Sequence, residues 1–228
     1  MKAILLSAGY GTRLGSLTKN LPKCLFEIKN KPIIQIWIEK LYDVGVRDIL
    51  INTHYLHNQV KIFIETLEYK NLKINIVFEK VLLGTAGTLY KNKNFINGDE
   101  CFLVHVDNYT KEDLHIFIKS HMKRKNFCLM SLMAHFTNQP SQCGILTVND
   151  DNVVIEYEEK PIKPKTNLAN SAIYILSKNF ISETNNLIYS KDFSTQVIPN
   201  LLGKINCFVS SQTNIDIGTQ ENFLRAKL

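Results

Sequence analysis

The sequence predicts an α/β fold of three layers, in which helices cover both faces of a mostly parallel, mixed central sheet. Short apolar runs alternate with amphipathic helical patterns through residues 1–135. The apolar runs are nearly continuous, which is typical of strands buried on both faces. This alternation favours parallel strands joined by helices, and ligands of such sheets bind beyond the carboxyl ends of the strands.

The first part of the chain contains apolar runs that predict strands at residues 2–9, 48–54, 74–79, 101–109 and 127–135. Amphipathic patterns between these runs predict helices at residues 31–46, 58–69, 84–96 and 111–125. Pro32 lies near the start of the first helix and Gly45 near its end, where both residue types are typical.

The pattern changes after residue 135. Residues 144–150 and 153–161 predict a hairpin with its turn at residues 150–152. Further strands are expected at residues 170–177 and within 207–218, and helical segments around 178–186, 194–202 and 219–228. Thr219 is the expected N-cap of the last helix. Because the sequence shows no repeat or linker, we expect one domain over residues 1–228.

The composition argues against several classes of protein. A net charge of +6 suits anionic, phosphorylated substrates, while the dispersed Lys and Arg residues argue against a nucleic-acid binder. No apolar stretch approaches the length of a membrane span, and residues 1–9 do not resemble a signal peptide, so we expect no membrane association. The five cysteines are scattered without a CxxC pair, which argues against zinc and favours a reducing cytoplasm.

The glycine-rich segment after the first strand predicts a triphosphate-binding loop. Gly9 and Gly11 allow close approach of the backbone to a ligand, and Arg13 and Lys23 can neutralise phosphate charge. The segment lacks the GKT or GKS of a Walker P-loop and the third glycine of a dinucleotide fingerprint. As a bare GxG it is equally compatible with a strand-to-helix turn in which the glycines serve geometry alone.

Residues 9–25, GYGTRLGSLTKNLPKCL, resemble the signature GxGTRLxPLTxxxPKxL of the sugar-1-phosphate nucleotidyltransferases, with Ser16 in place of its first proline. The resemblance continues through LLGTAGTL (82–89), VDNY (106–109), EKP (159–161) and NSAIY (170–174). DFSTQVIP (192–199) and IDIGTQENFLRA (215–226) resemble the ends of the mannose- and heptose-1-phosphate guanylyltransferases. The similarity covers nearly the whole chain and implies a Rossmann-like fold.

The resemblance implies a reaction. An oxygen of a sugar 1-phosphate attacks the α-phosphorus of a nucleoside triphosphate, giving an NDP-sugar and pyrophosphate, with Mg²⁺ as cofactor. We expect transfer of GMP from GTP, for the synthesis of a surface polysaccharide, by a monomer or a homodimer. The enzyme alternative is a cytidylyl- or uridylyltransferase with another phosphorylated acceptor, such as phosphocholine. A non-catalytic nucleotide-binding module is a further alternative, although such a module would not need metal carboxylates.

The resemblance also implies the site residues. Residues 1–135 would bind the nucleotide and residues 136–228 the sugar phosphate. Arg13 and Lys23 would be catalytic, Arg13 holding the β- and γ-phosphates and Lys23 the α-phosphate. The nucleotide-binding set is Leu6, Ala8, Gly9, Gly11, Thr12, Arg13, Lys23, Gly84, Thr85 and Gly87. Residues 82–89 resemble the base-recognition segment of the guanylyl-transferring members, so Gly84, Thr85 and Gly87 would shape the base pocket and read the base edge with backbone groups. Asp107 and Asp216 would hold the metal, and the substrate-binding set is Asp107, Glu159, Lys160 and Asn170.

Each of these residues also has a structural alternative. Asp107 could make an Asx turn at a strand end, and Asp216 could be the solvent-facing residue between two buried isoleucines. The chain departs from the family pattern at Ala172, where NxGxY has glycine, and at Cys143, where an aromatic residue is frequent. The added methyl group of Ala172 leaves the identity of the acceptor open. His105 could line the same pocket, but a core position is the expectation for it.

Overall fold

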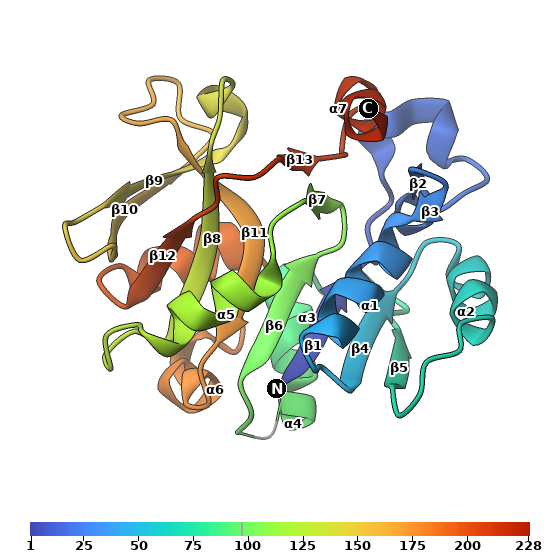
Figure 1. Ribbon diagram of the computed structural model, residues 1–228, viewed down its shortest axis with the longest axis horizontal. Coiled ribbons are helices and arrows are strands. Elements are labelled where there is room, and N and C mark those ends of the chain that lie inside the picture. Colours follow the sequence, from blue (N-terminus) through green and yellow to red (C-terminus); the bar gives the residue numbers. More distant parts are fainter. Residues whose placement is uncertain (97) are drawn as a thin grey trace.

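The computed structural model describes residues 1–96 and 98–228 (Figure 1). A nine-stranded sheet has the order β10-β9-β11-β6-β1-β4-β5, with β8 and β12 attached beside β11. Its strands are β1 (Lys2–Leu6), β4 (Asp48–Thr53), β5 (Lys73–Phe78), β6 (Cys101–His105), β8 (Met130–Phe136), β9 (Gly144–Val148), β10 (Val154–Glu159), β11 (Leu168–Leu176) and β12 (Ile205–Val209). β10 and β11 run opposite to the other strands, so the sheet is mixed but mostly parallel, as predicted.

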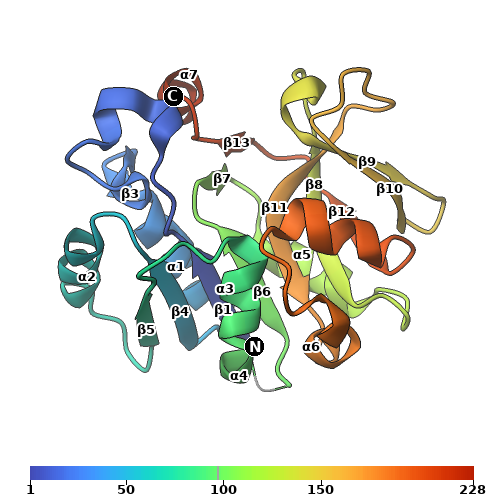
Figure 2. The ribbon, with the colours of Figure 1, turned by 180° about the vertical axis from the view of Figure 1, so that it is seen from behind.

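Helices cover both faces of this sheet. One face carries α1 (Ile33–Asp43), α2 (His57–Glu65) and α5 (Leu114–Met122). Figure 2 shows the opposite face. It carries α3 (Thr85–Lys91), α4 (Lys93–Ile96), α6 (Phe180–Glu183) and two helical turns at Phe193–Val197 and Ile198–Leu201. The three layers confirm the predicted architecture.

Alternation along each strand divides the core into two layers. In β1, Ala3 and Leu5 face α1 and α2, whereas Ile4 between them packs on the face of α3. All three are fully buried, and burial of a side chain the size of leucine or isoleucine contributes about 1.5–3 kcal/mol to folding. This two-sided burial explains why the strands appear in the sequence as continuous apolar runs.

Helix α1 connects the core to the region beyond the strand ends. Its apolar residues recur at helical spacing, and Trp37 and Leu41 are almost fully buried. Pro32 precedes the helix with an extended backbone, and Gly45 at φ 87° follows its end. The Trp37 indole N–H donates to the carbonyl oxygen of Asn108 at 3.0 Å. The helix therefore supports the turn that contains Asp107.

Two small strands connect the carboxyl-end loops. β7 (Asn108–Thr110) pairs antiparallel with β13 (Asn214–Asp216), which crosses above the sheet in Figure 1. The chain then enters α7 (Gln220–Lys227), where the side chain of Thr219 accepts from the amide of Asn222, as expected of an N-cap. The remaining short elements are β2 (Glu27–Ile28), β3 (Lys31–Pro32) and the 3₁₀ turns Thr12–Thr18, Lys23–Leu25, Pro140–Gln142 and Asn185–Leu187.

Two predicted elements are divided in the structure. The strand expected at 101–109 ends at His105 because the pairing partner changes: the amide of Val106 still bonds to Leu6, whereas the carbonyl of Asp107 accepts from Ile217. The helix expected at 84–96 is divided at Asn92 into α3 and α4. The strands expected within 207–218 are the end of β12 and the separate β13.

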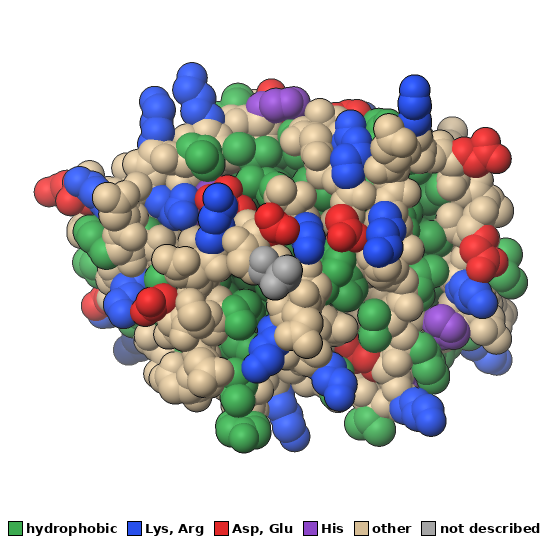
Figure 3. Space-filling model, turned by 90° about the horizontal axis from the view of Figure 1, so that it is seen from below, with side chains coloured by type: hydrophobic (Ala, Val, Ile, Leu, Met, Phe, Trp, Pro, Cys, Tyr) green, Lys and Arg blue, Asp and Glu red, His purple; other side chains and the backbone are tan. Residues whose placement is uncertain are grey.

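Surface features agree with the dispersed charge of the sequence. Figure 3 shows Lys and Arg side chains interspersed with Asp and Glu on the face away from the glycine-rich loop. Among the described residues, no helix combines the length and hydropathy that a membrane crossing requires.

Candidate active site

The glycine-rich loop lies where the order of the strands reverses. From β1 the chain moves outward through β4 to β5, and then returns to β6 on the other side of β1. Loops after β1 and β6 therefore diverge at their carboxyl ends and leave a crevice, the usual ligand site of open α/β sheets. The two segments singled out in the sequence, residues 9–13 and Asp107, follow these two strands.

The glycine-rich loop is tightly built. Gly11 has φ 67°, and a Cβ atom there would lie 2.8 Å from the Thr18 methyl group, so glycine is required for both reasons. The Tyr10 hydroxyl lies 2.8 Å from Nε2 of His54, and the Tyr55 hydroxyl donates to the carbonyl oxygen of Lys19. The loop after β4 thus braces the segment that carries the cationic side chains.

Four predicted residues meet at this crevice. The Lys23 ammonium donates to Oδ2 of Asp107 at 2.5 Å and lies 3.5 Å from Oδ1 of Asp216. The Arg13 guanidinium lies 3.5 Å from Oδ2 of Asp216. Lys23 is the most enclosed, with 11% of its side chain exposed, against 59% for Arg13. Residues that are up to 203 positions apart in the sequence therefore form one charge cluster.

The pairing of β7 with β13 positions the two carboxylates. Asp216 is the register partner of Asn108, directly after Asp107. Ile215 and Ile217 are buried on either side of Asp216, as alternation predicts. The Gly218 amide donates to Oδ1 of Asp216 at 2.7 Å, and a Cβ atom at Gly218 would lie 2.5 Å from the Arg13 guanidinium. Glycine at this position allows Arg13 to approach Asp216.

The charge cluster lowers the pKa of Asp107. Burial raises the pKa of this carboxyl, but the Lys23 ammonium lowers it by more, so the net pKa is below the ordinary value of 3.8. Burial lowers the pKa of the neighbouring His105, while the carboxylates of Asp107, Asp192 and Asp216 act in the opposite direction. Asp107 therefore carries its negative charge at neutral pH.

The two carboxylates fit a hard divalent cation. They converge from two different elements on one positive charge, the Lys23 ammonium. The described residues contain no group of three or more Asp, Glu, His or Cys side chains that could hold a metal. Two carboxylates, completed by phosphate oxygens and water, are a donor set that suits Mg²⁺ better than zinc.

The other residues expected to bind nucleotide surround the crevice. Leu6 ends β1, Ala8 is buried, and Gly9 and Thr12 are exposed along the loop. Leu6, Gly9, Lys23 and Asp107 line a cavity of about 40 Å³. A cavity of this volume has room for a few water molecules and is far smaller than a nucleotide. A larger cavity of about 480 Å³ lies outside the cluster, beside Lys111, His135 and Arg225.

The expected base-recognition segment packs against the second half of the chain. Gly84 has φ 81°, and a Cβ atom there would lie 2.3 Å from the carbonyl oxygen of Lys191. That oxygen accepts from the amides of Ala86 and Gly87, and the Thr85 hydroxyl accepts from the amide of Phe193. These bonds hold residues 190–193 against the start of α3. They also occupy backbone amides that the sequence suggested for reading the base.

A buried polar network behind this segment was not found from the sequence. The Glu79 carboxylate accepts from the Asn52 amide at 2.9 Å and from the Thr88 hydroxyl at 2.5 Å, and also from the amide of Leu83. Oδ1 of Asn52 accepts from the amide of Ser7 at the end of β1. The network joins the ends of β1, β4 and β5 to α3. Polar residues at the ends of apolar strands were its one signal in the sequence.

Of the expected acceptor residues, Glu159 ends β10, Lys160 directly follows it and Asn170 lies on β11. The Glu159 carboxylate accepts from the Tyr157 hydroxyl at 2.5 Å, and Gly144 leaves room for this contact. Lys160 is exposed and has φ 51°, a left-handed conformation that is uncommon for a residue other than glycine. Asn170 accepts from the amide of Ala172 and donates to the Tyr174 hydroxyl, so it holds the bulge of β11.

The comparison with known families identifies the chain at this point. A model described as nucleotidyl transferase matches residues 2–228. The chain belongs to the nucleotidyl transferase family. This finding confirms the family resemblance seen in the sequence, and the mixed α/β sheet is the fold of its solved relatives.

Several members of the nucleotidyl transferase family are similar over most of the chain. A D-glycero-alpha-D-manno-heptose 1-phosphate guanylyltransferase of Campylobacter jejuni is 30% identical over 183 residues, covering 80% of this chain and 79% of that protein. A Sulfolobus acidocaldarius protein assigned as a mannose-1-phosphate guanyltransferase is 30% identical over 234 residues, covering 100% of this chain and 62% of that protein. The chain thus spans less than two thirds of the Sulfolobus protein.

A solved member of the nucleotidyl transferase family has the same fold. HddC from Yersinia pseudotuberculosis, in complex with GMP-PN, superimposes with a TM-score of 0.79 at 26% identity. The match covers 99% of this chain and 97% of that structure. The overall fold of this nucleotidyl transferase is therefore shared over almost the whole of both chains.

Proposed function

We propose that this protein transfers a nucleoside monophosphate, GMP from GTP, to a sugar 1-phosphate, and releases pyrophosphate. The observation that carries the proposal is the convergence of Arg13 and Lys23 with Asp107 and Asp216 at the switch point. Phosphoryl-type transfers need aligned reactants and neutralised oxygens rather than a protein nucleophile. Two cations beside two carboxylates supply this environment.

Each residue of the cluster has a distinct role in the proposal. Lys23 binds an oxygen of the α-phosphate and stabilises the charge that develops there during attack. Arg13, which is more exposed, binds the β- and γ-phosphates that leave as pyrophosphate. Gly9 and Gly11 allow the loop backbone to approach the phosphates. Leu6, Ala8, Thr12, Gly84, Thr85 and Gly87 surround the nucleoside.

Members of the family generally use a divalent metal, and we propose Mg²⁺ for this chain. Asp107 and Asp216 would hold it, and the ion would supply charge neutralisation between the phosphates. The Lys23 ammonium contacts both carboxylates, so it would have to exchange these contacts for the α-phosphate if Asp107 and Asp216 held the ion. The carboxylates then position the phosphates relative to Lys23.

The choice of GTP and of a sugar 1-phosphate rests on the relatives. The names of the Campylobacter and Sulfolobus proteins specify guanylyl transfer to heptose and mannose 1-phosphates. We propose that residues 136–228 bind such an acceptor, with Lys160 on its phosphate and Glu159 and Asn170 on its hydroxyl groups. The product would serve the synthesis of a surface polysaccharide. A homodimer and a cytoplasmic location belong to the same proposal, and the five cysteines are free.

Pyrophosphate release tests the proposal directly. The purified protein is supplied with Mg²⁺ and each of ATP, GTP, CTP, UTP and dTTP, in combination with mannose, glucose and heptose 1-phosphates and phosphocholine. Release with GTP and a manno-configured sugar 1-phosphate is the expected result. Release confined to CTP with phosphocholine would replace the proposed substrates by the cytidylyltransferase alternative. An enzyme inactive with every pair, yet folded and able to bind GTP, would indicate a nucleotide-binding module.

A further inference from the structure

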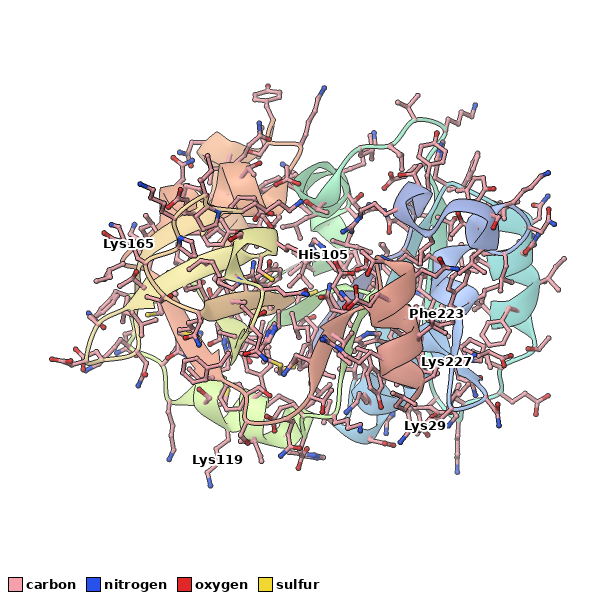
Figure 4. All side chains as sticks on the ribbon, turned by 90° about the horizontal axis from the view of Figure 1, so that it is seen from above. Lys29, His105, Lys119, Lys165, Phe223 and Lys227 are labelled. Atoms are coloured by element: carbon pink, nitrogen blue, oxygen red, sulfur yellow. The ribbon has the colours of Figure 1, made fainter. Side chains whose placement is uncertain are left out.

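His105 lies at the boundary between the nucleotide loop and the expected acceptor residues. It ends β6, and its register partner on β1 is Leu6. Its ring packs edge-to-face on the ring of Tyr174, with the centroids 6.2 Å apart. Figure 4 shows His105 near the centre of the molecule, between the two parts of the sheet. Two residues further along the chain is Asp107.

The imidazole of His105 has an unused polar atom. Its Nε2 is buried and has no hydrogen-bond partner among the described residues. Such an atom destabilises a fold by about 1–3 kcal/mol, because it loses water without gaining a partner. Native structures contain few of these atoms, and each one calls for an explanation, such as a bound water or ion or a functional role. The position of His105 at the end of an otherwise apolar strand strengthens this reading.

The surroundings of the ring favour a ligand from the acceptor side. The carboxylates of Asp107 and Asp192 act electrostatically on it, as do Asp216 and Lys23 of the charge cluster. The Tyr174 hydroxyl, on the ring that contacts His105, accepts from the side-chain amide of Asn170. His105, Tyr174 and Asn170 therefore connect the Asp107 turn to the bulge of β11. β1, which leads into the glycine-rich loop, pairs with β6 on the side opposite β11.

We propose that Nε2 of His105 forms a hydrogen bond with a hydroxyl group of the sugar 1-phosphate acceptor. This inference rests on the proposed function, and it adds a residue that recognises the acceptor. A sugar hydroxyl can donate to or accept from Nε2, so either tautomer of the imidazole can form the bond. This bond gives the buried Nε2 a hydrogen-bond partner and holds the acceptor beside Asp107. His105 thereby contributes to acceptor affinity and has no role in nucleotide binding.

Two substitutions test this role. His105→Phe keeps a ring on Tyr174 and removes the nitrogen, and His105→Gln places an amide nitrogen near the position of Nε2. We expect His105→Phe to raise KM for the acceptor about tenfold, with KM for GTP changed less than twofold. The free energy of unfolding is expected to equal or exceed that of the native chain, because an unpaired buried atom is lost. His105→Gln is expected to restore much of the acceptor affinity.

His121 provides a matched control. It is a fully buried histidine on α5 whose Nε2 also forms no hydrogen bond among the described residues, although Oε1 of Glu100 lies 3.4 Å from it. Its Nδ1 lies 2.8 Å from the Ser131 hydroxyl, within the core and away from the crevice. We expect His121→Phe to change stability while KM for the acceptor remains that of the native chain.

The outcomes separate this inference from the proposed function. If the native chain releases pyrophosphate but His105→Phe has an unchanged KM for the acceptor, the His105 inference is wrong and the proposed function stands. If His105→Phe raises KM equally for both substrates and His105→Gln does not recover acceptor affinity, His105 contributes only to packing and the inference is again wrong. If the native chain is inactive with every substrate pair, the proposed function fails first. Titration calorimetry with mannose 1-phosphate would then test the acceptor contact independently of turnover.

Discussion

The Lys23 ammonium lies 2.5 Å from Oδ2 of Asp107, although the two residues are separated by 84 positions in the sequence. The contact joins the segment after the glycine-rich loop to the turn after β6. Lys23 is largely enclosed, and about a third of the Asp107 side chain is exposed. Such a pair can separate when ligands of the right charge are present. A metal ion can replace Lys23 as the partner of Asp107, and a phosphate can replace Asp107 as the partner of Lys23.

Substitution Asp107→Asn is expected to lower kcat by about 100-fold or more, because the amide cannot hold a divalent cation or balance Lys23. Steady-state pyrophosphate release measures the effect. Asp99→Asn is the control: Asp99 also pairs with a lysine, Lys2, at 3.4 Å, but lies before β6 at the opposite end of the strands. Near-native turnover in Asp107→Asn would remove Asp107 from the metal site.

The lowered pKa of Asp107 predicts a pH-dependent contribution to stability. A carboxyl whose pKa in the folded state is below 3.8 stabilises the protein above that value, and the contribution is lost as the pH falls through the folded pKa. Lys23→Met removes the main cause of the lowered pKa and leaves the effect of burial, which raises it. The stability deficit of Lys23→Met is therefore expected to be larger at pH 7 than at pH 3.

Urea unfolding of the native chain and Lys23→Met at pH 7, 5, 4 and 3 measures this difference. Other titratable groups are common to both proteins, so their effect on the free energy of unfolding cancels when the two are compared at the same pH. A deficit that stays constant over the series would mean that the ammonium does not lower the pKa of Asp107. Salt is expected to reduce the deficit only modestly, because Lys23 is enclosed.

The sequence predicted those parts of the fold and site that depend on local pattern. Continuous apolar runs located the strands, and alternation around Asp216 predicted which way its side chain points. The family resemblance identified the residues of the charge cluster, Arg13 and Lys23 in the signature and Asp107 and Asp216 in later segments. Their mutual distances depend on the pairing of β7 with β13, and this pairing joins segments more than 100 residues apart. No periodicity in the sequence records such a long-range contact.

Other features were missed because they arise from partners in space. Glu79 appears in the sequence as a charged residue after an apolar strand, yet it is buried and accepts bonds from Asn52 and Thr88. Gly84 was expected to shape the base pocket, and its contact with Lys191 could not be inferred from either segment alone. Burial and close approach are properties of the assembled chain, so only the structure shows them.

Substitution Gly84→Ala tests the docking of residues 190–193. The added Cβ atom would lie 2.3 Å from the Lys191 carbonyl oxygen, so the segment must move away from α3. Gly203→Ala is a matched control because Gly203 has φ 79° and open space around it, so it isolates the conformational cost of about 1–2 kcal/mol. We expect urea unfolding to show a larger destabilisation for Gly84→Ala, together with a raised KM for both substrates. Equal losses of stability would show that the contact is readily rearranged.

Ala172 is held in a conformation that favours glycine, and it occupies the position where the family motif has glycine. Its φ is 52°, within the bulge of β11, and its amide donates to Oδ1 of Asn170. An L-residue in this region is destabilised by about 1–2 kcal/mol, partly offset by the greater freedom of glycine in the unfolded chain. Ala172→Gly is therefore expected to raise the free energy of unfolding by about 0.5–1 kcal/mol.

The neighbouring Ala169 separates this effect from a general response of β11. Ala169 is fully buried, has an ordinary strand pairing with His135, and is expected to lose about 1 kcal/mol or more when replaced by glycine. Urea unfolding of both variants, with equal m-values, measures the contrast in sign. Destabilisation by Ala172→Gly as well would mean that the methyl group contributes more to packing than the backbone conformation costs. In that case the Ala172 methyl group would help to stabilise the bulge of β11, together with the hydrogen bonds of Asn170.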